Sequence, residues 1–392
     1  MQPFHPRRPR LVAGACAVVL ALGLGACSDS GGGSGDAPPT GAAGGVASRY
    51  TTPLKGVCPD RVVVQAGWWP EVDDGYLYQL LGADPTIDTG RNRVVGQLGG
   101  TGVELEIRAG GPAVGFQPVS SQMAQDDDIL AGVLGLDEAV QQSGNQPTVA
   151  VFASYEKSPL AFIWGDPAWK FTSVADIGRA DVTVLGSAGA AYLDVFKRQG
   201  QLSSSRIDTS YQGDPARFVA ADGKIVQQAF ITNEPYRLEH DVKAWGKPVE
   251  YLLLGDEYPV YLPMLTVRAD KLAANRDCLG KLVPLFQQAQ RDYVTDPGPT
   301  NQVLLRTVET LNTSGFALSE GLLADGSAKQ KSLGLIANGT DGVLGSFDTA
   351  RVQKLIGQLV PVFEAQGTKP KPGLAPSDLM TNEFLDTSVS LS

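Results

Sequence analysis

Aromatic and polar side chains follow several of the expected β-strands, at positions where a small ligand could be stacked and hydrogen-bonded. Trp68 and Trp69 come directly after an apolar stretch, residues 61–65, and Tyr76 lies one turn into the next expected helix. Asn233, Glu234 and Tyr236 follow a second apolar stretch, residues 226–231. Aromatic rings supply stacking area, and a few fixed polar groups orient a flat ligand.

Two further strand ends carry polar residues. Asp137 and Glu138 follow the expected strand 129–134, and Ser187 follows the strand 181–185 at the start of an expected helix. The free N–H groups of such a helix start could hold a polar or anionic group. Ligands of open α/β sheets bind at the carboxyl ends of the strands, so we expect these residues, with Tyr155, in one cleft.

Each candidate also has a structural interpretation, which the sequence leaves open. Trp68 and Trp69 could simply cover the core. Ser187, and Asp137 with its neighbour Glu138, could serve only as helix caps. Glu234 precedes a proline and could lie in a solvated turn.

Residue counts exclude several classes of protein. The sequence has two histidines, and His5 lies in the N-terminal stretch that we expect to be removed as a signal. Multi-histidine metal sites are therefore excluded, and a catalytic triad would depend on His240. The stretch Leu185–Gly189 lacks the first glycine of the G-x-S-x-G pattern, and no phosphate-binding glycine loop is present. We therefore expect no catalytic residue, no metal and no cofactor.

The charge balance argues against nucleic-acid binding. The formal net charge of the chain is −10. Removal of residues 1–26, with their three arginines, leaves 29 basic and 42 acidic residues, a net charge of −13. Nucleic-acid-binding proteins usually carry a basic surface instead.

The N-terminus has the layout of an export signal. Three arginines (Arg7, Arg8, Arg10) precede an apolar run at 11–24, and small residues lead to Cys27. This arrangement resembles the lipobox of bacterial lipoproteins, which implies removal of residues 1–26 and acylation of Cys27. An ordinary signal peptide or an uncleaved anchor stays open. Residues 27–56 begin with a stretch rich in glycine and small residues, which predicts a flexible tether beside a membrane.

Two cysteines remain once Cys16 and Cys27 are assigned to the leader and the lipid. Cys58 and Cys278 form an even pair in an exported, oxidising setting, so we predict a disulfide between them. Two separate buried thiols are the alternative.

The pattern of elements predicts an α/β protein. Short apolar strands alternate with helices up to residue 268, which predicts a largely parallel sheet covered on both faces. About 335 ordered residues exceed the usual size of one hydrophobic core, so we expect two lobes. Asp73 or Asp74 is expected to cap a helix ending near Leu81, and Ser187 a helix ending near Gln199. Amphipathic helices are expected at residues 281–293, 299–311 and 349–366.

Several stretches together resemble a known family. The lipobox, VVVQAGWWPEVDDGYLYQLLG, ILAGVLGLDEAV, DVTVLGSAGAAYLDVFKRQG and VQQAFITNEPY are similar to ABC-transporter solute-binding lipoproteins of the nitrate/sulfonate/taurine and thiamine-pyrimidine-precursor type. The resemblance implies a two-lobed periplasmic-binding-protein fold (type II) with a ligand cleft between the lobes. Lobe 1 would comprise residues 57–163 and 259–392, and lobe 2 residues 164–258. It also implies an ABC permease and its ATPase as partners. Pyrimidine-synthase relatives of similar architecture rely on a histidine and a cysteine-rich segment, and this sequence lacks that combination, so we expect no enzymatic activity.

The sequence departs from anion-binding relatives at the strand ends. Carboxylates (Asp137, Glu138, Glu234) stand where an anion would favour a basic residue, and a buried carboxylate beside an anion costs several kcal/mol. We therefore expect the ligand to be a neutral or protonatable nitrogenous ring, stacked on Trp68 or Trp69 and hydrogen-bonded by Glu234. We also expect the protein to be a monomer. A sulfonate or nitrate binder, a related pyrimidine-synthase-like enzyme and a structural lipoprotein remain alternatives.

Overall fold

The computed structural model describes residues 49–82, 84–311 and 316–391. The expected leader, Cys27 and most of the expected tether lie outside these residues. Within the described ranges, no helix combines the length and the apolar character needed to cross a membrane.

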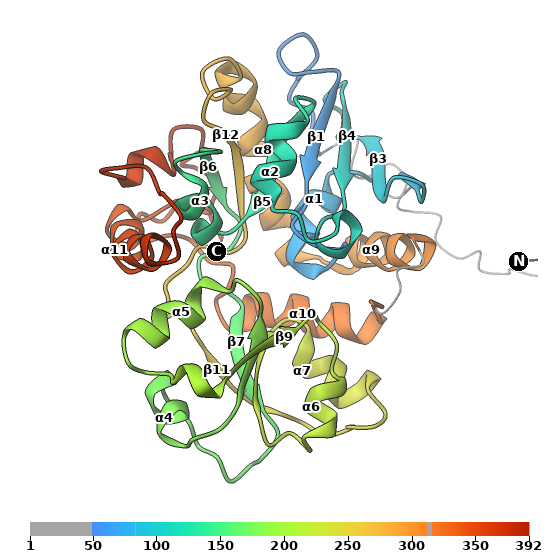
Figure 1. Ribbon diagram of the computed structural model, residues 1–392. Helices are drawn as coiled ribbons and strands as arrows, with labels where there is room; N and C mark the ends of the chain where they lie inside the picture. The colour runs from blue at the N-terminus through green and yellow to red at the C-terminus, as the bar shows by residue number, and fades with distance from the viewer. Residues whose placement is uncertain (1–48, 83, 312–315, 392) are drawn as a thin grey trace, which may run out of the picture. The chain divides into compact units, whose positions relative to one another are not determined.

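A seven-stranded mixed sheet forms the first layer of β-structure (Figure 1). Its strands, in spatial order, are β2 (Thr86–Asp88), β3 (Arg93–Gln97), β4 (Glu104–Arg108), β1 (Arg61–Gln65), β5 (Ile129–Leu134), β12 (Met264–Arg268) and β6 (Thr148–Ala153). β1 pairs in parallel with β4 and with β5, whereas the other pairs are antiparallel. The expectation of a largely parallel sheet was therefore wrong, because a β2–β3 hairpin adds antiparallel strands at one edge and the returning strand β12 inserts antiparallel between β5 and β6.

A second, five-stranded sheet is also mixed. Its strands, in spatial order, are β11 (Glu250–Leu253), β7 (Leu160–Trp164), β10 (Val226–Phe230), β8 (Val184–Ser187) and β9 (Ile207–Tyr211). β10 and β9 run parallel to β8, and β7 runs antiparallel to its neighbours. Since β7 belongs to this sheet, the lobe boundary placed after residue 163 falls inside one of its strands.

Helices cover both sheets (Figure 1). The helices between strands are η1 (Val72–Asp74), α1 (Gly75–Gln79), η2 (Gly111–Val114), α2 (Val119–Gln125), α3 (Leu136–Gln142), α4 (Val174–Arg179), α5 (Ala191–Arg198), η3 (Ser204–Arg206), α6 (Ala216–Ala220), α7 (Glu234–Tyr236) and η4 (Arg237–Asp241). After β12 come α8 (Arg276–Thr295), α9 (Gly298–Leu311), α10 (Glu320–Ser332), α11 (Thr349–Ala365) and η5 (Pro376–Asp378). The three helices expected in this second part correspond to α8, α9 and α11.

Two expected helix caps are absent. Asp74 occupies the N-cap position of α1 without a side-chain cap, and Asp73 directs its carboxyl group to other partners. Ser187 does not begin α5, which starts at Ala191. Ser187 instead extends β8, because its backbone pairs with Tyr211 of β9. This correction moves Ser187 from a helix tip to the last position of a strand.

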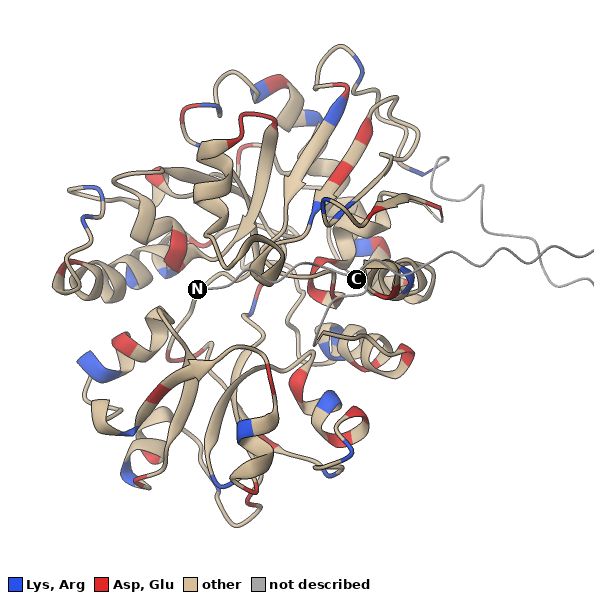
Figure 2. Ribbon diagram, turned by 45° about the vertical axis from the view of Figure 1, so that its right-hand side comes forward, with Lys and Arg blue, Asp and Glu red and all other residues tan. Residues whose placement is uncertain are grey.

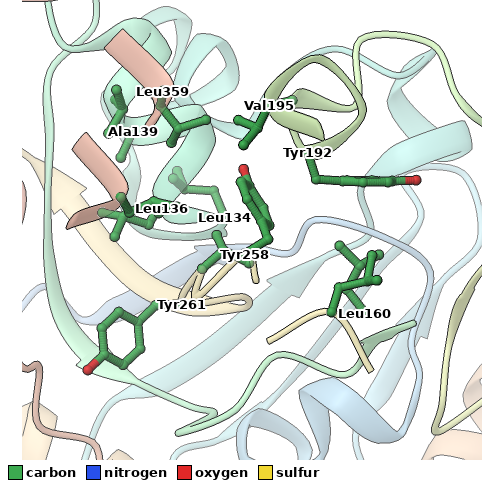
Figure 3. Close-up of a cluster of buried hydrophobic side chains, with 14 of the residues drawn as sticks. Leu134, Leu136, Ala139, Leu160, Tyr192, Val195, Tyr258, Tyr261 and Leu359 are labelled. Carbon is green, nitrogen blue, oxygen red and sulfur yellow. The ribbon is translucent and has the colours of Figure 1, made fainter. Parts of the chain in front are cut away.

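The chain passes between the sheets twice, at residues 154–159 and 254–263, and these passages lie side by side. The Ser154 hydroxyl donates to Pro263 O at 2.9 Å, and Leu254 N donates to Leu160 O at 3.0 Å. A hydrophobic cluster containing Leu134, Leu160, Tyr192 and Tyr258 continues from one sheet to the other (Figure 3). The ends of the strands are therefore held next to one another by buried apolar contacts.

The expected disulfide is present. Cys58 and Cys278 are bonded, with their Cα atoms 4.8 Å apart, and the bond closes a separation of 220 residues. It attaches the segment before β1 to the first turn of α8.

Candidate ligand-binding site between the two sheets

Trp68 lies where the loops after β1 and β4 face the second sheet. Its ring covers Gly111, where an added Cβ would lie 2.3 Å from the ring. Gly111 also has φ +54°, so glycine is required there for both reasons. The far edge of the Trp68 ring lies 3.7 Å from the Cβ position of Gly213, in the loop after β9. Trp68 therefore bridges loops of the two sheets.

Phe116 extends this aromatic surface. Its ring centroid is 5.8 Å from that of Trp68, with the planes tilted by 55°, and 54% of its surface is exposed. Phe116 also has φ +59°, an unusual conformation for a residue with a side chain. An exposed ring beside the half-buried Trp68 leaves aromatic area free for a ligand.

Ser187 is the last residue of β8, which lies between β9 and β10 in the second sheet. Gln228 Oε1 accepts hydrogen bonds from Ser187 N at 2.9 Å and from the Tyr192 hydroxyl at 2.6 Å. These bonds fix the end of β8 against β10. The Ser187 hydroxyl makes no hydrogen bond to another described residue.

Glu234 is held by Tyr211, whose backbone pairs with that of Ser187. Its Oε1 accepts from the Tyr211 hydroxyl at 3.0 Å, and its Oε2 accepts from Phe230 N at 2.7 Å. Burial raises the pKa of Glu234, although these bonds and the nearby Arg237 oppose the shift. The carboxyl group is therefore oriented, and its charge is only partly balanced.

A second polar group joins the loop after β1 to the loop after β10. Asn233 Nδ2 donates to Glu71 Oε2 at 3.3 Å, and the Thr232 hydroxyl donates to Asp73 Oδ2 at 3.2 Å. The other oxygen of Asp73 accepts from the Tyr155 hydroxyl. Tyr155 thus contributes from the first passage between the sheets, where it is 1% exposed.

Burial gives these carboxyl groups unusual acidities. Desolvation raises the pKa of Asp73 to about 6 and, with repulsion from Asp73, that of Asp74 to about 8. Burial, and then repulsion from Asp73, Asp74 and Glu234, raises the pKa of Glu71 well above its usual range. Lys and Arg are spread over strands, helices and loops in Figure 2. The carboxyl groups of Glu71, Asp73, Asp74 and Glu234 lie near enough to repel one another.

Two of the expected site residues lie in hydrophobic clusters. Trp69 is buried with Ala109 and Leu311, and Tyr76 is fully buried between Phe152 and Phe286. Both side chains pack in these clusters and so support the segment that follows β1.

The other expected residues pack beside the site. Glu138 accepts from the Ser120 backbone at 2.9 Å and from its hydroxyl at 2.7 Å, so it stabilises the start of α2. Asp137 accepts from the Tyr258 hydroxyl at 3.2 Å. Tyr236 lies over His240, with the ring centroids 4.3 Å apart. None of these bonds involves Ser187 or Glu234 directly.

Three residues of this region, Tyr211, Gln228 and Phe116, are not indicated by the sequence. The β9 stretch, IDTSY, has too few apolar residues to be recognised as a strand, so its last residue was not a candidate. Side chains alternate along β10, and Gln228 lies on the face that meets Ser187 and Tyr192. This alternation could have been predicted from the sequence. Phe116 lies in a loop, where only a contact in space reveals its role.

No protein-family model matches the chain, and no curated protein matches it in sequence. Solved structures are similar in fold. One is the ligand-binding component of an ABC-type import system from Staphylococcus aureus, with zinc bound (14% identity, 84% of this chain and 100% of that chain covered, TM-score 0.52). Another is the periplasmic aliphatic sulphonate-binding protein SsuA from Escherichia coli (13% identity, 86% and 94% covered, TM-score 0.51).

The fold is therefore that of the periplasmic solute-binding proteins, an α/β architecture built on two sheets. The fold expected from the sequence is confirmed. Within the described residues, no group of three or more His, Cys, Asp or Glu is arranged to hold a metal ion.

Proposed function

We propose that this protein is the extracytoplasmic solute-binding component of an ABC importer. The observation that supports this function best is the approach of Trp68, after β1, to Gly213, after β9. This approach occurs in a fold that solute-binding proteins share. It places strand ends of both sheets next to one another, and ligands of open α/β sheets bind at strand ends. Movement about residues 154–159 and 254–263 would open and close such a site.

The proposed solute is a small nitrogenous ring. Trp68 offers a stacking surface, and Glu234 offers an oriented carboxyl group that can accept an N–H. Ser187 adds a hydroxyl from the end of β8. These groups come from different strands, so together they would fix both the plane and the orientation of the ring.

A sulfonate or nitrate-type anion is the second candidate. The name of the Escherichia coli neighbour states an aliphatic sulphonate as its ligand. The positive charge of Arg237 lies close enough to Glu234 to oppose the rise in pKa that burial causes. Arg237 forms no ion pair with another described residue. An anion placed there would also meet Glu234, which is the main objection to this candidate.

The proposal includes a place at the membrane. Export by the N-terminal signal and acylation of Cys27 would tether the lobes to the outer face of the cell membrane. A permease and its ATPase would receive the solute from the monomeric protein. Metabolic labelling with palmitate tests the anchor: label is expected on the wild type and absent from a Cys27→Ser variant.

A thermal-shift screen of the purified protein tests the function. Sulfonates, nitrate, pyrimidines, flavins and amines are compared, because a ligand selective for the native state raises the Tm. At least one class is expected to raise it, and calorimetry with Glu234→Ala should then show weakened binding. If no class changes the Tm, a structural lipoprotein becomes the better interpretation. Turnover of a bound pyrimidine would instead favour an enzyme.

A further inference from the structure

The junction between the sheets contains several buried oxygens that accept no hydrogen bond from a described residue. Glu71, Asp73 and Asp74 lie within four consecutive residues and are 8%, 5% and 4% exposed. Among these three residues, only Asp73 accepts a hydrogen bond from a described residue at each of its two carboxyl oxygens. No bond is recorded there for the carboxyl group of Asp74.

Two buried amides add acceptors that lack a partner. Asn233 is 6% exposed, and its Oδ1 has no hydrogen-bond partner although its Nδ2 binds Glu71. Gln330 of α10 is fully buried, and its Oε1 is likewise unpartnered. The Gln330 Nε2 donates to Val72 O at 2.9 Å and to the Tyr155 hydroxyl at 2.5 Å. Both amides therefore direct their N–H groups at the segment of residues 71–74. Their oxygens remain buried acceptors without a donor, which is costly.

Positive charge at this place is limited. Lys329 of α10 is already paired with Asp325 at 2.7 Å. The positive charge of Arg237, in η4, opposes the rise in the pKa of Glu234. Repulsion from Glu234 raises the pKa values of both Glu71 and Asp73, so these carboxyl groups lie within electrostatic reach of one another. One small cation could therefore interact with carboxyl groups from both sheets.

We propose, building on the solute-binding function above, that the solute is an organic cation with several N–H donors, such as an amidinium or a substituted ammonium. Its N–H groups would meet the carboxyl groups of Glu71 and Glu234 and the amide oxygens of Asn233 and Gln330. The rings of Trp68 and Phe116 at the edge of the junction suit the same charge, because a cation is attracted to an aromatic face. Directional N–H donors fit the unpartnered amide oxygens better than a bare ion would.

Three probes of similar shape and different charge test this inference. Benzamidinium, benzamide and benzenesulfonate are added separately to the purified protein at pH 7.5, and thermal shift and titration calorimetry are measured. Benzamidinium is expected to raise the Tm and to bind at least about ten-fold more tightly than benzamide, as a charge-assisted hydrogen bond predicts. Equal or tighter binding of benzamide or benzenesulfonate would overturn the inference and leave solute binding intact.

Variants locate the bound cation. Glu71→Gln and Glu234→Gln are each expected to weaken benzamidinium binding about ten-fold or more. Glu364→Gln, on the exposed surface of α11, removes one carboxylate elsewhere and should leave the affinity unchanged. Equal losses in all three variants would mean a non-specific charge effect and would contradict the proposed site. Absence of a response to benzamidinium, while other classes in the wider screen raise the Tm, would contradict the cation alone.

Discussion

The Tyr211 hydroxyl donates a 3.0 Å hydrogen bond to Oε1 of Glu234 and so joins the end of β9 to the turn after β10. Phe230 N holds the other oxygen of the same carboxyl group. Glu234 is therefore oriented before any solute arrives. Preorganisation of this kind lowers the entropy lost on binding.

Removal of that bond should weaken solute binding without unfolding the protein. Tyr211→Phe keeps the buried ring and leaves Glu234 with one fewer donor, so we expect a loss of about 1–2 kcal/mol in binding free energy. Calorimetry with the solute identified by the screen measures the loss. Tyr251→Phe is the matched control, because Tyr251 is 44% exposed. Equal affinities of the two variants would show that the Tyr211 bond does not position Glu234.

Stability should fall as the pH rises. The pKa of Asp73 is raised from 3.8 to about 6 and that of Asp74 from 3.8 to about 8, so the folded state binds protons more tightly than the unfolded chain. Asp73 and Asp74 make their full contribution to stability below about pH 4, where both are protonated. The contribution of Asp73 is lost as the pH rises through about 6, and that of Asp74 as the pH rises through about 8. The slope for one such group approaches about 1.4 kcal/mol per pH unit.

Denaturant unfolding between pH 5.5 and pH 8.5 measures this dependence. Asp74→Asn removes the group that titrates at the higher pH, so its free energy of unfolding should change less between pH 6 and pH 8. Glu71 and Glu234 also have raised pKa values and keep part of the dependence in the variant. An unaltered slope in Asp74→Asn would contradict the assignment.

The contact between α10 and both sheets depends on a missing side chain. A Cβ at Gly326 would lie 2.7 Å from Thr232 O and 2.9 Å from Cγ1 of Val72. Gly326→Ala should therefore force α10 away from these loops and destabilise the protein by about 1–3 kcal/mol.

Gly357 of α11 provides the control for that substitution. Nothing lies within 4 Å of its Cβ position, so Gly357→Ala should stabilise the helix by up to about 1 kcal/mol. Chemical denaturation of the two variants gives both values. Opposite signs are expected, and a neutral Gly326→Ala would show that α10 adjusts without cost.

The disulfide should contribute strongly to stability. Cys58 and Cys278 close a loop of about 220 residues, and the chain-entropy model assigns such a loop up to about 5 kcal/mol. A Cys58→Ser/Cys278→Ser variant is expected to lose several kcal/mol in unfolding free energy and to become insensitive to reductant. If reductant lowers the Tm of the variant as much as that of the wild type, another effect is responsible.

Long amphipathic helices were predictable, whereas short polar elements were not. α8, α9 and α11 repeat apolar residues at helical spacing, so the sequence alone indicates them. α10 carries glycine and serine and has no clear apolar face. It is held by Gln330 and by the close approach at Gly326. The β2–β3 hairpin and β9 were missed because their stability comes from their neighbours in the sheets.

Residue types, by themselves, determined the α/β class and placed Trp68, Ser187 and Glu234 near strand ends. They predicted the pairing of Cys58 with Cys278 but left two separate thiols open, and the structure decided for the bond. The class and the strand-end positions depend on local spacing and on which elements are adjacent along the chain. Only the tertiary structure decided that Tyr76 is buried in the core, that Tyr211 orients Glu234, and that Glu71 meets Asn233 from a position 162 residues away. The physical reason is that burial, acidity and hydrogen-bond partners depend on distances in space, which a sequence does not specify.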